Sequence, residues 1–147
     1  MQGEYGRAYA DYSEALELRP DFAACLYDRG ITSMAREDYA AAERDFEAAT
    51  ALIPTWGEAY YWLGNARFRQ DAFAAAIESY DRAIEQLPAH APSYHARGLS
   101  HRHLGHREEA IADLERVLTL TRDPYLLSGA QSQLDELRAE NQEDATD

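Results

Sequence analysis

The residues best suited to chemistry in this chain are its five histidines, most of which fall in the segment HARGLSHRHLGH. Histidine is the commonest metal ligand in proteins. On a helix His101 and His103 point about 200° apart, so they cannot bind one ion together, and His103 meets His106 only if the helix runs past the intervening glycine. His95 and His103 share a face but stand two turns apart. We therefore expect solvated histidines and no metal site.

No spacing in the sequence combines a nucleophile, a general base and a group that orients the base. The segment GHREEA lacks the lysine and the preceding strand of a phosphate-binding loop. The carboxylates are scattered along outward helix faces, where solvation explains them. Cys25 is the single cysteine, so no disulfide framework exists. The sequence predicts neither enzymatic activity nor a cofactor.

The charge of the chain limits its partners. It has 27 acidic residues against 14 basic ones, all of them arginine, for a net charge of −13. Binding to phosphates needs a basic face, so DNA, RNA and anionic membranes are disfavoured. No apolar run approaches the ~18 residues of a membrane span, and the start MQGEYGRAYADYSEAL lacks the features of a signal peptide. We expect a cytoplasmic protein, and the absence of lysine hints at a GC-rich bacterial genome.

A spacing of 34 residues organises the chain. Each unit reads as two helices, with Asp38 and Asp71 as the expected N-caps of second helices and Pro54 as a stop. No segment alternates with period two, so strands are not expected. The same residue types recur in four columns: Gly30, Gly64 and Gly98; Ala8, Ala42, Ala76 and Ala110; Tyr12, Phe46, Tyr80 and Leu114; Pro20, Pro54 and Pro88.

With these columns the chain resembles the tetratricopeptide repeat family. That family pairs an aromatic-x2-Leu-Gly first helix with an Ala-x3-aromatic second helix and closes on proline. The middle unit fits best, with Tyr60, Leu63, Gly64, Ala76, Tyr80 and Pro88. The chain departs from the pattern at Arg122, where proline is expected, and at a later first-helix tyrosine, replaced by Ser33, Arg67 and His101. The resemblance covers roughly residues 3–122 and implies an all-α fold, a right-handed α-solenoid of helix-turn-helix repeats.

Both ends of the solenoid differ from a full repeat. The N-terminal segment matches only a second helix, and Asp123–Pro124 reads as the N-cap and first residue of an amphipathic C-terminal helix. A polar outer face on that helix would cap the stack. The expected organisation is a solenoid over 1–140, made of a half repeat at 1–20, full repeats at 23–54, 57–88 and 91–122, and a capping helix at 123–140, followed by an acidic flexible tail at 141–147.

The resemblance implies that first helices line a concave groove. With Tyr60 on the packing face, Tyr61 and Asn65 point towards that groove, while Trp62 lies at its border and either faces the groove or packs against an adjacent first helix. This face is near neutral and rich in apolar and aromatic side chains, as binding surfaces are. The predicted groove residues are Tyr27, Asp28, Ile31, Met34, Tyr61, Trp62, Asn65, Phe68, Arg69, His95, Leu99 and Arg102.

The leading functional hypothesis is a non-catalytic protein–protein interaction module that binds a peptide or helix of a protein partner in the groove. Many family members bind a terminal carboxylate through Lys, Asn and Arg of successive first helices. Here Asn65 stands alone, with Tyr27 and Ala96 where basic residues would be, so that recognition is disfavoured. The alternative is a structural or oligomerisation scaffold, or an excised segment of a larger protein without its own ligand.

An aromatic stripe marks the half repeat. Tyr5, Tyr9, Tyr12 and Leu16 are spaced i, i+4, i+7 and i+11, so they share one helix face. The half repeat has no first helix of its own for this stripe to cover. We expect either a second copy of the chain, giving a homodimer, or an upstream helix to cover it, with the upstream helix favoured.

Two charge pairs are in register across the helices of a unit. Arg29 aligns with Asp45, and 68 residues later Arg97 aligns with Asp113. In the middle unit the arginine position holds a leucine and the aspartate position holds a serine, so both partners change together. This covariation predicts an Arg–Asp bridge in the first and third full repeats.

Overall fold

The computed structural model describes residues 2–144 of the chain, and side chains over residues 3–140. Residues 2–144 form eight helices and no strand, which confirms the all-α prediction. None of these helices is long and apolar enough to cross a membrane. Their bounds are α1 (Gln2–Leu18), α2 (Ala23–Ala35), α3 (Tyr39–Leu52), α4 (Gly57–Phe68), α5 (Phe73–Gln86), α6 (Ala91–His103), α7 (Arg107–Leu120) and α8 (Pro124–Asp144).

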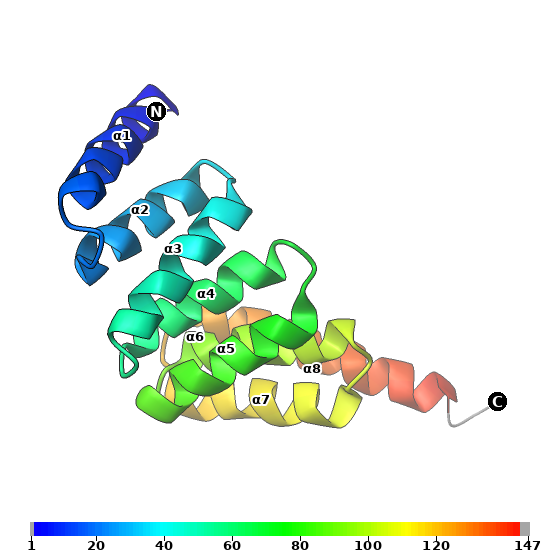
Figure 1. Ribbon diagram of the computed structural model, residues 1–147. Helices are drawn as coiled ribbons and strands as arrows, with labels where there is room; N and C mark the ends of the chain where they lie inside the picture. Colours follow the sequence, from blue (N-terminus) through cyan, green and yellow to red (C-terminus); the bar gives the residue numbers. More distant parts are fainter. Residues whose placement is uncertain (1, 145–147) are drawn as a thin grey trace.

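The helices stack in chain order as a right-handed α-solenoid, with α1 at one end and α8 at the other (Figure 1). Each helix packs mainly on the helices before and after it in the chain. Contacts also join α2 to α4, α4 to α6, and α6 to α8. The first helices α2, α4 and α6, together with α8, therefore lie side by side as one layer.

Small residues let the two helices of a repeat approach closely. A Cβ added to Gly64 would lie 2.4 Å from the Tyr80 ring, and one added to Gly30 would lie 2.8 Å from the Phe46 ring. Both rings are fully buried. Any larger side chain at these glycines would push the second helix away from the first.

The turns inside the full repeats share one backbone geometry. Glu37, Asp71 and Gly105 stand 34 residues apart, and all three have positive φ, between 59° and 75°. Asp38 follows the first of these turns and caps α3, accepting a hydrogen bond from the Ala41 amide at 3.1 Å. The prediction that Asp71 is an N-cap is wrong, because it aligns with Glu37 in the turn; Ala72 occupies the N-cap position of α5.

The C-terminal helix α8 takes the place of a fourth first helix. Asp123 Oδ1 accepts hydrogen bonds from the Tyr125 and Leu126 amides at 2.9 and 3.0 Å, and Pro124 begins the helix, as predicted. The helix runs to Asp144, four residues past its expected end, and the last part of the expected tail, 145–147, lies outside the described residues. Its inner face buries Ala130, Leu134 and Leu137 against α6 and α7.

The predicted Arg–Asp bridges are confirmed. Arg29 donates to both carboxylate oxygens of Asp45 at 2.7 and 2.9 Å, and Arg97 donates to both oxygens of Asp113 at 2.6 and 2.8 Å. Both aspartates are 5% exposed. In the middle repeat Arg67, one turn further along its helix, donates to Ser79 Oγ instead. Each repeat thus joins its two helices through one guanidinium.

The prediction that a second copy of the chain or an upstream helix covers the stripe on α1 is wrong at the C-terminal end of α1, which α2 of the same chain covers. Leu16 is only 7% exposed because it packs on α2 of the same chain, with Tyr12 against the same cluster. The guanidinium of Arg36 lies over the Tyr9 ring at 4.6 Å. In this solenoid the second helix of a repeat packs on the first helix of its own repeat and also on the first helix of the next repeat. The aromatic stripe of α1 includes residues from both of these packing faces. Tyr5 remains 40% exposed.

Candidate binding groove

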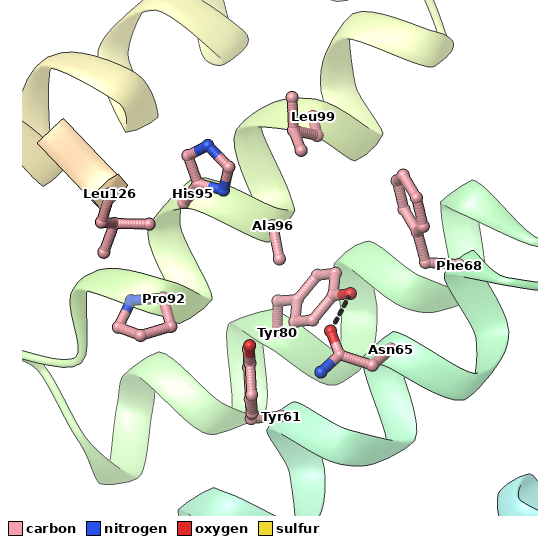
Figure 2. Close-up of a pocket in the computed structure, with 9 residues that line it drawn as sticks. All are labelled: Tyr61, Asn65, Phe68, Tyr80, Pro92, His95, Ala96, Leu99 and Leu126. Carbon is pink, nitrogen blue, oxygen red and sulfur yellow. Dashed lines mark hydrogen bonds between the residues drawn. The ribbon is translucent and has the colours of Figure 1, made fainter. Parts of the chain in front are cut away.

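A hollow of about 240 Å³ opens between α4, α6 and the start of α8 (Figure 2). We call the residues that line it the central pocket. Five of the twelve predicted groove residues meet there. The lining residues are Tyr61, Asn65, Phe68, Tyr80, Pro92, His95, Ala96, Leu99 and Leu126.

Tyr80 fixes the polar side of the central pocket. Its hydroxyl donates to Asn65 Oδ1 at 2.9 Å, as the dashed line in Figure 2 shows. Burial raises the pKa of Tyr80 well above its ordinary value, which keeps the hydroxyl protonated as a donor. The Asn65 Nδ2 group donates no hydrogen bond to another described residue. The amide therefore keeps its two N–H donors available at the pocket wall.

Tyr61 forms the wall of the central pocket on the side of α4. Its half-buried ring meets His90 edge-on at 5.0 Å and Trp62 at 5.6 Å between ring centroids. Past this ring a second hollow of about 540 Å³ continues along the start of α8 to Tyr125, which is 89% exposed. The two hollows together run across α4, α6 and the start of α8.

Phe68 closes the other end of the pocket. Its ring meets Phe73 and His103 edge-on at 5.3 and 5.5 Å, and His103 stacks on Phe73 at 4.2 Å.

Two other histidines lie close together: the Nδ1 atoms of His101 and His106 are 3.3 Å apart. No group of three or more metal-ligating side chains is assembled within the described part of the chain.

His95 packs between the pocket and α8. Its Nε2 atom is buried without a hydrogen-bond partner among the described residues, and Gly129 of α8 lies against it. Burial lowers the pKa of His95, so the ring is neutral near pH 7. A neutral ring here adds apolar surface to the pocket rather than charge.

Three predicted groove residues of α2, Tyr27, Ile31 and Met34, are half-buried and pack partly on other residues of the chain. Tyr27 stacks on Trp56 at 4.6 Å, and Ile31 and Met34 pack against the buried cluster around Phe46. Trp62, predicted either to face the groove or to pack, joins the same cluster between α2 and α4. Asp28 is exposed but lines neither hollow.

Both predicted groove arginines are bound within the chain. The Arg69 guanidinium lies 4.4 Å from the Tyr39 ring centre and hydrogen-bonds its hydroxyl. Arg102 pairs with Glu136 at 2.8 Å and Glu140 at 3.3 Å and also bonds Gln133, all on α8. Both guanidiniums are therefore already engaged by other side chains of the same chain.

Sequence comparisons agree with this geometry. Models of the tetratricopeptide repeat match residues 2–55, 27–91 and 91–124. The chain belongs to the tetratricopeptide repeat family. No curated protein matches the chain.

Solved structures show the same tetratricopeptide repeat fold. A crystal structure of MamA superposes with a TM-score of 0.80 at 24% identity, covering 99% of this chain and 93% of MamA. The first such domain of Spaghetti (RPAP3), bound to the HSP90 peptide SRMEEVD, gives 0.76 at 24% identity over 80% of this chain and 91% of its own. The Yersinia enterocolitica type III secretion chaperone SycD, in complex with a peptide of the translocator YopD, gives 0.76 at 18% identity over 79% and 92%.

Four lining residues of the central pocket, Tyr80, Pro92, Ala96 and Leu126, are not among the twelve predicted groove residues. The sequence identifies Tyr80 only as a member of a repeated column, whereas in the structure its hydroxyl reaches Asn65 at the pocket wall. Leu126 was assigned to a cap, but the 34-residue spacing that links Glu58 to Pro92 continues to Leu126. The 34-residue spacing therefore continues into residues 123–140 and places α8 beside the first helices that line the pocket.

We expect the free energy of unfolding to fall as the pH drops below about 6.5. Burial lowers the pKa of His90, His95 and His101 from the ordinary 6.5. As the pH falls, these histidines therefore become protonated in the unfolded chain before they do so in the folded chain. The part of the free energy of unfolding that is present above pH 6.5 is lost as the pH falls towards the pKa values of the folded chain. Urea unfolding at about pH 7.5 and about pH 5.5 measures the difference. His95→Gln should reduce it, with the exposed His103→Gln as control; an unchanged difference in His95→Gln would contradict the role of this ring.

Proposed function

We propose that this chain is a non-catalytic protein–protein interaction module that binds a peptide or short helix of a partner in the central pocket and the hollow beside it. The observation that carries the proposal is the pocket itself. Half-buried apolar side chains surround an amide whose two N–H donors bond no other described residue. Concave apolar sites with a few placed polar groups are the usual form of ligand sites.

Two similar structures support a peptide as the class of ligand. The RPAP3 domain holds a peptide of HSP90, and SycD holds a peptide of YopD. The HSP90 peptide, SRMEEVD, is rich in acids. Here the groove arginines are engaged within the chain, so we propose a ligand with an apolar anchor instead.

The pocket specifies how such a ligand would bind. An apolar side chain would fit among Tyr61, Phe68 and Leu99, and a main-chain carbonyl would accept from Asn65 Nδ2. Outside the pocket the net charge of −13 sets a negative field. That field speeds the approach of a ligand with basic residues beside its anchor.

The mutational test starts from peptides selected from a random library with the whole chain as bait. Tyr61→Ala is expected to weaken their binding about tenfold or more, because buried aromatic side chains dominate binding energies. Ala96→Trp fills the pocket without removing a core side chain and should have a similar effect. The matched control is Tyr5→Ala, an exposed tyrosine on α1, which should leave affinity within about twofold. Equal affinities for all four proteins would contradict the proposal and favour a structural scaffold.

A further inference from the structure

The first helix, α1, is built as the second helix of a repeat. It packs on α2, the first helix of the next repeat, but the described chain has no first helix of the repeat to which α1 itself belongs. We call Ala8, Asp11, Tyr12 and Ala15 the open face of α1. The 34-residue spacing aligns Tyr12 with three fully buried core residues. It aligns Asp11 with the two bridging aspartates, each 5% exposed. On α1 itself, Ala8, Tyr12 and Ala15 are only half-buried and Asp11 is exposed. The buried counterparts are Phe46, Tyr80 and Leu114 for Tyr12, and Asp45 and Asp113 for Asp11.

The full repeats show what covers such a face. In the first repeat, Gly30 sits so close to the Phe46 ring that a Cβ would lie at 2.8 Å, and Arg29 beside it pairs with Asp45 at 2.7 Å. In the third repeat, Arg97 and Gly98 occupy the same two positions. The element that covers this face in these two repeats is therefore a helix. It places a small residue against the side chain that aligns with Tyr12. Directly before that small residue, it places a cation against the aspartate that aligns with Asp11.

Charge distinguishes the occupants of this face. On α1 four acids, Glu4, Asp11, Glu14 and Glu17, stand against one base, Arg7. Asp11 forms no ion pair with any side chain that the structure describes. Two copies of α1 brought face to face would place like charges together, which disfavours a two-fold contact. A helix that carries a cation opposite Asp11 would relieve this charge instead.

We propose that the open face of α1 binds a helix of a partner protein that places glycine, alanine or serine against Tyr12 and, directly before it, an arginine or lysine against Asp11. The partner helix completes the repeat that α1 begins. This surface lies at the opposite end of the stack from α8, so the proposal is independent of the groove (Figure 1).

The chain supplies its own probe for this surface. A peptide of residues 89–104, AHAPSYHARGLSHRHL, carries the Arg97–Gly98 pair of α6. A hydrocarbon staple between positions 95 and 99 holds it helical, since short free helices are marginal in water. Titration calorimetry with the whole chain should show one-to-one binding, and Gly98→Leu in the peptide should abolish it.

Charge reversal gives the decisive comparison. Asp11→Arg is expected to weaken peptide binding at least about tenfold, and Arg97→Glu in the peptide should recover part of that loss. The matched control is Glu17→Arg, an exposed α1 residue whose counterparts in all later repeats are also exposed, with an expected change below about twofold. Circular dichroism confirms that each variant is folded.

Three results would overturn the proposal. One is equal weakening by Asp11→Arg and Glu17→Arg. Another is no binding of the stapled peptide at about 1 mM. The third is a dimer in sedimentation equilibrium that Tyr12→Glu dissociates, because that result would assign the open face to a second copy of this chain.

Discussion

Gly64→Leu is expected to abolish the cooperative unfolding transition of the chain. Even a Cβ at this position would lie 2.4 Å from the Tyr80 ring, and that ring is fully buried and held by its bond to Asn65. The ring has no space to yield, so α4 and α5 must separate. Overpacking costs about 1–3 kcal/mol or more, and here it also exposes the core between two repeats. Urea unfolding followed by circular dichroism measures the loss.

The matched control for Gly64→Leu is Gly6→Leu in α1. A Cβ at Gly6 meets nothing within 4 Å, so leucine there should leave stability unchanged or raise it through its better helix propensity. Gly98→Ala should fall between the two, because its nearest neighbour, Asp113 Cβ, lies at 3.2 Å. Equal unfolding midpoints for Gly64→Leu and Gly6→Leu would refute the close-approach argument.

Asp113→Ala is expected to destabilise the chain by about 3 kcal/mol, near the lower end for breaking a buried pair. The substitution removes two hydrogen bonds to Arg97 and leaves its guanidinium only partly compensated by Asp81 at 2.5 Å. An arginine side chain does not lose its proton in proteins, so the guanidinium of Arg97 stays charged after its main partner is removed. The free energy of unfolding in urea gives the cost.

An exposed pair provides the control for Asp113→Ala. Arg138 and Glu115 are bridged at 2.7 Å with about half of each side chain exposed. Glu115→Ala should cost about 0–1 kcal/mol. If Asp113→Ala costs no more than this, the bridge does not hold the third repeat together.

The repeat architecture was predictable because each repeat solves the same packing problem with the same residue types. Gly64 lies against Tyr80 and Gly30 lies against Phe46 for the same reason, because a glycine lets the two helices of a repeat approach closely. The fixed spacing of 34 residues makes both pairs visible in the sequence. The Arg97–Asp113 bridge was predictable because two columns change together in the middle repeat. Such columns report contacts within a repeat.

Contacts that do not repeat were not predictable from the spacing. Arg102 turns from the groove to α8 because Glu136 and Glu140 stand opposite it, a contact that occurs at one end of the stack. Leu16 is buried by α2, the helix that follows it. Matching the stripe of α1 only to the first helix of its own repeat does not predict this contact. Five of the predicted groove residues line the central pocket, whereas Trp62 packs on the cluster around Phe46.

The most direct test of the proposed function is nuclear magnetic resonance of the labelled chain titrated with a peptide selected against it. The account predicts that the largest amide shifts cluster on α4, α6 and the start of α8, with Asn65 Nδ2 protons shifting as they find an acceptor. Tyr61→Ala should remove these shifts at the same peptide concentration. Shifts centred on α3, α5 and α7, with no change at Asn65, would place the binding surface on the second helices and contradict the account.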